Sequence, residues 1–124
     1  KIHLVVDDLS HLRRTGRISF STSAFGTLLN IKPVLVFKNG EILLKTKIRT
    51  INKVYEYLVD LIKNSNLNSN SKIIIAHANG YDSALKLKEK VLEVYPNHNV
   101  TIEELSPVVS VHTGAKSFGL SWIY

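Results

Sequence analysis

The chain has 124 residues, of which 44% are hydrophobic and 21% charged, as in an ordinary globular protein with one domain. Its 16 lysine and arginine residues outnumber 10 acidic ones, and the resulting net charge of +6 permits anionic partners without choosing among them. The absence of cysteine excludes disulfides, thiol catalysis and cysteine-ligated zinc.

The sequence contains no methionine and starts at Lys1, so we expect a fragment or a processed chain. No signal peptide is visible. The longest apolar runs are far shorter than the roughly 20 residues that span a bilayer. We therefore expect a cytoplasmic protein without transmembrane insertion.

Three elements are expected in the first quarter of the chain. Residues 1–6 alternate apolar and polar side chains and then run apolar, which is typical of a strand at a sheet edge. Asp7 and Asp8 are suited to cap a short helix that ends near Gly16, because carboxylates accept hydrogen bonds from the amides of a first turn. Residues 21–29 have the spacing of a second short helix.

The rest of the chain alternates strands and helices. Asn39-Gly40 between two apolar runs predicts a β-hairpin, because these residues tolerate the positive φ angles of a type I′ turn. Helical spacing predicts one helix after a Thr50 cap and another that opens at Asp82 or Ser83 and is closed by Pro96. The expected segments are strands over 34–37, 41–48, 72–76, 99–105, 108–111 and 118–123, helices over 51–62 and 82–94, and an Asn/Ser-rich loop over 64–71.

This succession of elements predicts the fold class. A hairpin followed by β-α-β units is typical of an α/β fold of two layers, a mixed sheet with helices packed on it. The sequence contains no internal repeat. We expect one domain over residues 1–124.

Two motifs combine a cation with small hydroxyl side chains. Arg17 and Ser19 follow a glycine turn at Gly16, and His112 and Thr113 lie at a predicted strand end. Guanidinium, imidazole and hydroxyl groups are donors that proteins use to hold a carboxylate or a phosphate. Because the chain between the motifs is rich in leucine, isoleucine and valine, the pattern suggests a fatty-acid site. Structural roles also fit, with Arg17 paired to a nearby aspartate and His112 partly buried at a strand end.

Four stretches together resemble the DegV family, whose members look like bacterial fatty-acid carriers. They occur in the family's order and span nearly the whole chain: residues 6–19, 28–35, 47–49 and 107–114. The resemblance covers the C-terminal domain of a two-domain fold, so we expect the N-terminal domain to be missing from this chain. After Gly114 the chain departs from the pattern, because Ala115-Lys116-Ser117 stands where members often have proline and glycine. Lys116 adds a cation near His112.

The resemblance implies a mixed sheet of about six strands and one acyl chain held between two domains. It implies that the carrier presents a long-chain fatty acid to a fatty-acid kinase, which phosphorylates the carboxylate to an acyl phosphate. The carrier itself would then be no enzyme, with no catalytic residue, metal or cofactor. Arg17 and His112 would bind the carboxylate together with Ser19 and Thr113.

Two further groups of residues are candidates for contacts in such a carrier. Three basic residues share one face of a predicted strand, where they would dock an acidic kinase surface or, alternatively, protect a sheet edge in solvent. Five apolar residues would line the acyl chain, unless they are simply core. The basic residues are Lys45, Lys47 and Arg49, and the apolar ones are Phe25, Leu28, Leu29, Ile31 and Val34.

Two other classes of function stay open. An enzyme domain related to dihydroxyacetone kinases would need a nucleotide or covalent site, but the sequence has no phosphate loop, dinucleotide fingerprint or Gly-x-Ser-x-Gly elbow. A nucleic-acid-binding module would rest on charge alone, because the aromatic residues, 8% of the chain, do not interleave with the basic ones. The 5 histidines show no His-x-x-x-His pair, so we expect no metal site.

Overall fold

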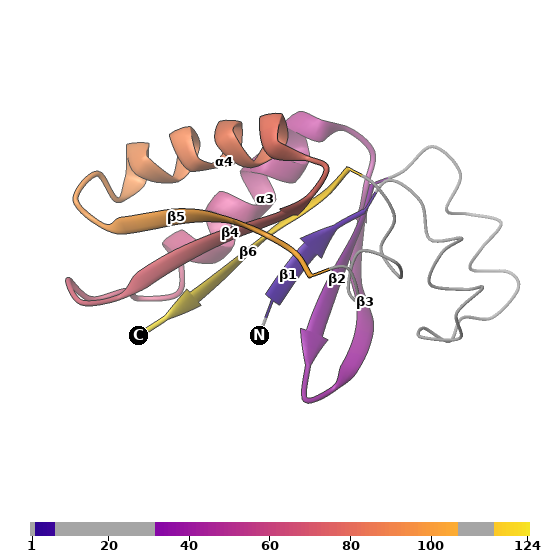
Figure 1. The fold of residues 1–124 in the computed structure, drawn as a ribbon, viewed down its shortest axis with the longest axis horizontal. Coiled ribbons are helices and arrows are strands. Elements are labelled where there is room, and N and C mark those ends of the chain that lie inside the picture. Colours follow the sequence, from indigo (N-terminus) through magenta and orange to yellow (C-terminus); the bar gives the residue numbers. More distant parts are fainter. Residues whose placement is uncertain (1, 7–31, 107–115) are drawn as a thin grey trace, which may run out of the picture.

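A computed structural model gives the fold of residues 2–6, 32–106 and 116–124, which are the residues that the structure describes. They form a six-stranded mixed sheet with two helices packed on one face (Figure 1). The expected two-layer α/β fold with about six strands is therefore confirmed. In chain order the elements are β1 (Ile2–Val5), β2 (Lys32–Lys38), β3 (Glu41–Ile48), α3 (Ile51–Lys63), β4 (Lys72–Ala78), α4 (Tyr81–Val94), β5 (Asn99–Glu104) and β6 (Ser117–Ile123).

The strand order in the sheet is β3-β2-β1-β6-β4-β5. β4 and β5 are parallel and are joined by α4, whereas the other neighbouring pairs are antiparallel. The β-α-β unit predicted from the sequence is thus present at one side of the sheet. Its single parallel pair is what makes the sheet mixed.

β1 lies inside the sheet between β2 and β6, so its predicted place at an edge is wrong. Leu4, Val5 and the following Val6 are at most 2% exposed, because both faces of an interior strand are covered. His3 is also buried, and its ring stacks on the Trp122 ring of β6 with the centroids 5.6 Å apart. His3, the polar residue that made this segment look half exposed, is buried and packs against an aromatic ring.

The β2–β3 hairpin turns at Asn39-Gly40 as predicted, with φ angles of 51° and 77°. Both angles lie in the left-handed region that asparagine and glycine tolerate. The ladder then shifts: Thr46 pairs with Val34, but Leu44 pairs with the next residue of β2, so Lys45 lies in a β-bulge. β3 is the edge strand next to β2, and exposed and half-buried residues alternate along its length.

α3 begins at the predicted cap. The Thr50 side-chain oxygen accepts a hydrogen bond from the Lys53 amide at 3.3 Å, which satisfies one of the free donors of the first turn. The buried face of the helix repeats at helical spacing and consists of Val54, Tyr55, Leu58 and Ile62.

α4 begins at Tyr81, one or two residues before the predicted start at Asp82 or Ser83. The chain turns earlier than expected because Asn79 adopts a positive φ of 55° and Gly80 becomes the N-cap. The two polar residues that looked like caps therefore lie inside the first turn. Gly80 makes no side-chain cap hydrogen bond.

The other predicted elements in the described ranges agree with the structure within two residues. α4 ends at Val94, just ahead of Pro96 as expected. The predicted helices before residue 31 and the strand over 108–111 lie outside the described residues. None of the helices that the structure describes is long and apolar enough to cross a membrane.

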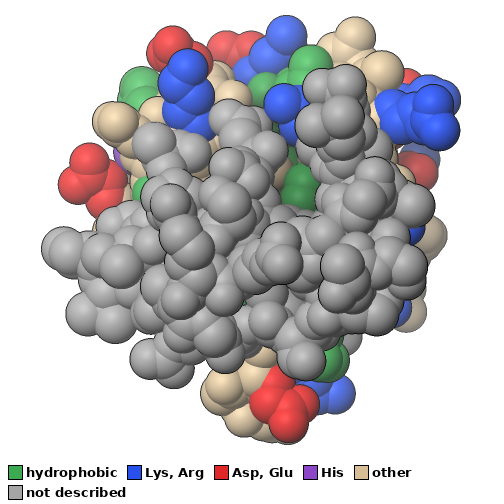
Figure 2. Space-filling model, turned by 90° about the vertical axis from the view of Figure 1, so that its right-hand side faces the viewer, with side chains coloured by type: hydrophobic (Ala, Val, Ile, Leu, Met, Phe, Trp, Pro, Cys, Tyr) green, Lys and Arg blue, Asp and Glu red, His purple; other side chains and the backbone are tan. Residues whose placement is uncertain are grey.

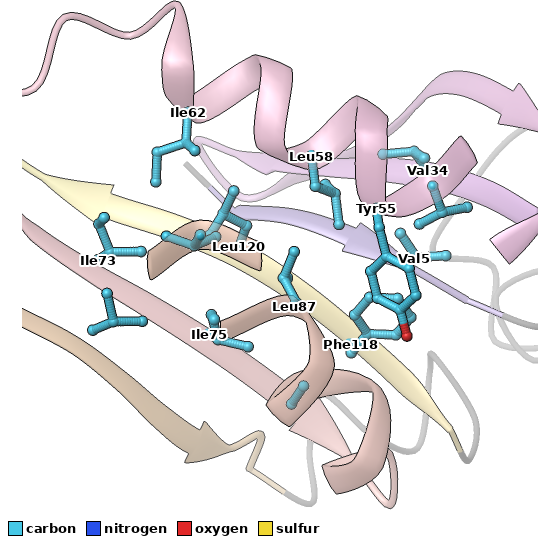
Figure 3. Close-up of a cluster of buried hydrophobic side chains, with 14 residues drawn as sticks. Val5, Val34, Tyr55, Leu58, Ile62, Ile73, Ile75, Leu87, Phe118 and Leu120 are labelled. Atoms are coloured by element: carbon cyan, nitrogen blue, oxygen red, sulfur yellow. The ribbon is translucent and has the colours of Figure 1, made fainter. Parts of the chain in front are cut away.

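The main core lies between the sheet and the two helices. Figure 3 shows Leu58 of α3 and Leu87 of α4 among strand residues such as Ile75 and Leu120, all with no solvent exposure. Burying one such side chain contributes roughly 1.5–3 kcal/mol. Val34, a candidate acyl-chain contact, is fully buried in this core.

A second, smaller core lies on the other face of the sheet. Leu4, Val6 and Leu35 form a separate buried cluster. They alternate along their strands with Val5 and Val34 of the main core, so their side chains point to the opposite face. The sheet is thus apolar on both faces near β1 and β2.

Gly119 of β6 allows β1 to approach closely, because a Cβ at this position would overlap the carbonyl oxygen of His3. We expect Gly119→Ala to lower the free energy of unfolding by about 3 kcal/mol, since the backbone of an interior strand has little room to shift. Urea unfolding followed by circular dichroism measures this loss. Gly40→Asn is the control, because Gly40 has open space and a φ that asparagine tolerates. Equal stability of the two variants would contradict the prediction.

Candidate functional site

One edge of the sheet collects the carboxyl ends of β1, β3, β4 and β5 together with the amino ends of β2 and β6. The pairings establish this arrangement, because Val5 lies opposite both Val34 and Phe118, and Ala78 lies opposite Ser117. Ligands of α/β proteins commonly bind outside the carboxyl ends of parallel strands, here β4 and β5. The edge formed by these six strand ends is called the carboxyl edge below.

A cavity of about 650 Å³ opens at the carboxyl edge. Its volume lies within the roughly 300–1,000 Å³ that is usual for small-molecule sites. The wall combines the first turn of α4 with residues at the ends of β4, β5 and β6. Its polar residues include His77, Asn79, Asp82, Ser83, Glu104 and Lys116.

His77 is the most buried of the titratable residues that line this cavity, with 6% of its surface exposed. Its Nδ1 atom accepts a hydrogen bond from the Gly80 amide at 3.3 Å, and its ring meets the Tyr81 ring edge-on at 5.7 Å. Because Nδ1 accepts, the neutral ring carries its proton on Nε2. The side chain that orients the start of α4 therefore keeps one N–H donor, at Nε2, for another partner.

The start of α4 lies against the first residues of β6. A Cβ at Gly80 would lie 2.9 Å from the carbonyl oxygen of Ser117, so only glycine fits without a shift. The first helical hydrogen bond is donated by Ala84 to the Gly80 carbonyl at 2.9 Å. The amides of Tyr81, Asp82 and Ser83 precede that bond, and such amides have no acceptor within their helix.

Charges of both signs surround the cavity. Lys32 and Lys116 line it together with Asp82 and Glu104, so these four formal charges cancel. Figure 2 shows basic and acidic side chains of the described residues around the margin of this side. Within the ranges 2–6, 32–106 and 116–124, no group of three or more histidine or acidic side chains could hold a metal ion.

Lys116 is the cation that the sequence places near the predicted head-group motif. It is exposed, lines the cavity and has a positive φ of 64°, which is uncommon for a residue with a side chain. Glycine would adopt this angle without strain. The chain therefore keeps a cation at this position at some cost in backbone energy.

The predicted carboxylate-binding residues Arg17, Ser19, His112 and Thr113 lie outside the described residues, as do Phe25, Leu28, Leu29 and Ile31. The described residues that flank them all belong to the carboxyl edge. Residues 7–31 join β1 to β2, and residues 107–115 join β5 to β6. The strand ends that these two segments connect therefore lie at the carboxyl edge, and the roles of these residues stay predictions.

The basic residues predicted to share a strand face are all exposed. Lys45 and Lys47 belong to β3, but Arg49 follows the end of the strand at Ile48. Exposed and half-buried residues alternate along the whole of β3 despite the bulge at Lys45, and Lys45 and Lys47 both belong to the exposed set. Because β3 is an edge strand, both interpretations, kinase docking and edge protection, stay open.

His77 and the first turn of α4 were missed by the sequence analysis. A signal for them exists, because His77 directly follows the predicted strand over 72–76 and precedes an Asn79-Gly80 turn and a helix. Such a strand-turn-helix junction presents helix amides at the carboxyl end of a strand. The proximity of Lys116, almost 40 residues further along the chain, had no local signal.

Comparisons with known proteins agree with one another. The model of a family described as "Uncharacterised protein, DegV family" matches residues 1–124. A DegV domain-containing protein of Halalkalibacterium halodurans is 38% identical over 119 residues, which are 95% of this chain and 42% of the relative. Two crystal structures are similar at TM-scores of 0.83 and 0.72: a fatty acid binding DegV family protein from Streptococcus agalactiae and DegV, a fatty acid binding protein from Bacillus subtilis.

These two structures are 31% and 34% identical to the chain, of which they cover 96% and 98%. The chain covers only 43% of either structure, so it spans less than half the length of its relatives.

The hydrogen bond from the Gly80 amide to His77 gives a testable prediction for the start of α4. His77→Phe keeps a ring but removes the acceptor, so we expect the free energy of unfolding to fall by about 2 kcal/mol because a buried amide loses its partner. Hydrogen exchange of the Gly80 amide should become faster. His77→Asn is the matched variant, because its side-chain oxygen can still accept from that amide. Unchanged Gly80 exchange in His77→Phe would show that the bond does not hold the turn.

Proposed function

This chain belongs to the DegV family, and from that premise we propose that it is the C-terminal domain of a carrier for a long-chain fatty acid. The observation that carries the proposal is that two solved relatives, 31% and 34% identical to the chain, are described as fatty acid binding. Because the chain covers 43% of each, the N-terminal domain that completes the carrier is part of the proposal.

The affinity of such a carrier comes mainly from the acyl chain. Each methylene group that moves from water into an apolar wall contributes roughly 0.8 kcal/mol. Phe25, Leu28, Leu29 and Ile31 are the proposed wall residues of this domain. Val34 is the fifth proposed wall residue, and it is buried in the main core.

Head-group contacts then determine orientation and specificity. Arg17 and His112 hold the carboxylate, and the hydroxyl groups of Ser19 and Thr113 are further donors. A charge-assisted hydrogen bond is about twice as strong as a neutral one. Support comes from the carboxyl edge, where both segments that carry these residues join the sheet.

We further propose that the carrier presents the carboxylate to a fatty-acid kinase and has no catalytic residue of its own. Phosphorylation joins a phosphoryl group to a carboxylate oxygen, so that oxygen has to be reachable from the surface. Lys45, Lys47 and Arg49 are the proposed docking residues for the kinase, because they are exposed beside an edge strand. A cytoplasmic location belongs to the same proposal, since the kinase needs a nucleotide donor from inside the cell.

Lipid content tests the proposed function directly. We expect the intact protein that contains this chain, purified from a bacterial host, to carry close to one fatty acid per molecule. Native mass spectrometry gives the stoichiometry, and chloroform extraction identifies the lipid. Folded protein that contains no fatty acid, and takes none up from a lipid mixture, would overturn the proposal.

The head-group assignment has its own test. Arg17→Ala and His112→Ala in the intact protein should each weaken fatty-acid retention about tenfold or more, because each removes a charge-assisted bond worth roughly 1.5–3 kcal/mol. Displacement of a fluorescent fatty acid measures the affinity. Arg14→Ala and His98→Ala are matched controls that remove the same residue types elsewhere. Equal retention in all four variants would show that these contacts are misassigned.

A further inference from the structure

We propose that the cavity at the carboxyl edge is a binding site for a small oxyanion, a carboxylate or a phosphate, held by His77, Lys116 and the first turn of α4. The proposal names residues other than the predicted head-group set. The proposal also holds for a protein that carries no fatty acid, because the donors that recognise a carboxylate recognise a phosphate as well.

The first argument is the buried imidazole. His77 uses Nδ1 to accept from the Gly80 amide, which leaves the Nε2 proton as the free donor of a side chain that is 6% exposed. Among the described residues, no acceptor bonds to this donor, although the side chain lines the cavity. The buried unsatisfied atoms of these residues do not include Nε2, so this N–H faces the open cavity, where a ligand oxygen can accept from it in place of solvent.

The second argument is the uncapped helix. α4 has 14 residues, and its N-cap, Gly80, has no side chain that could accept from the first-turn amides. Tyr81, Asp82 and Ser83 carry these amides, and all three residues line the cavity. The partial positive charge at a helix N-terminus favours an anion at this place. A ligand oxygen would thus take the position that a serine or aspartate cap occupies in other helices.

The third argument is that the polar groups with fixed positions around the cavity are hydrogen-bond donors. The Gly80 hydrogen bond holds the imidazole and α4 holds its first-turn amides, and Lys116 adds a cation beside these donors. The carboxylates of Asp82 and Glu104 belong to exposed residues, where solvent screens their repulsion. Fixed donors therefore favour an anion, and the two acidic residues moderate its affinity.

The experiment uses the intact protein, freed of lipid, and inorganic phosphate as the probe at constant pH and ionic strength. Nuclear magnetic resonance of the His77 ring reports binding. We expect phosphate to shift this resonance, His77→Asn to weaken phosphate binding about tenfold, and Lys116→Gln to weaken it several-fold. His77→Asn keeps an acceptor for Gly80 but has no donor at the Nε2 position. Lys72→Gln, at the far end of β4, is the matched control and should bind normally.

Glu104→Gln separates an anion site from a cation site. If the cavity binds an oxyanion, removing this negative charge should tighten phosphate binding about two- to threefold. Weaker phosphate binding in Glu104→Gln, or equal binding in His77→Asn and the parent protein, would overturn the proposal. So would the absence of any shift of the His77 resonance with phosphate and with a fatty acid.

The source of the oxyanion is found by competition. A fatty acid that displaces phosphate from the cavity identifies the ligand as a lipid head group. A fatty acid that binds while phosphate stays in place identifies a separate site for free phosphate. Both outcomes support the oxyanion site. Because phosphate alone tests the cavity, a protein that binds no fatty acid can still confirm or overturn the site.

Discussion

The close packing of β6 is the constraint on which the rest of the structure depends, because β6 joins the antiparallel half of the sheet to the β4-α4-β5 unit. Gly119 brings it against the backbone of β1, and Gly80 brings the start of α4 against its first residues. A side chain at either glycine would meet a carbonyl oxygen of the neighbouring segment. Since β6 is the last strand along the chain, the cavity at the carboxyl edge forms only when this strand is in place.

If the cavity binds an oxyanion as proposed, backbone geometry selects the ligand there and formal charge does not. Its two lysines and two acidic residues cancel, and the exposed ones are screened by salt. The amides of the first turn of α4 and the Nε2 proton of His77 are different, because the helix and the Gly80 hydrogen bond fix them in place. Donors that are already oriented need no reorganisation when an anion binds.

Features that the sequence predicted well are those whose cause lies within a few residues. The positive φ angles of Asn39-Gly40 and the Thr50 cap of α3 are local properties, and both are present. The place of β1 inside the sheet depends on pairing with a strand more than 100 residues away, which no local pattern contains. The same holds for the cavity, because His77 and Lys116 become neighbours only through the pairing of β4 with β6.

A carrier that serves a kinase has two opposed requirements, to keep an acyl chain away from water and to keep its carboxylate reachable. A single enclosed site would keep the acyl chain away from water but would also make the carboxylate unreachable. Under the proposed function, the fold has separate elements for the two requirements. Apolar strand faces near β1 and β2 suit the chain, whereas the cavity beside α4 is bordered by exposed residues such as Tyr81, which is 54% exposed. A head group at the carboxyl edge would therefore stay accessible to a second protein without exposing the apolar chain.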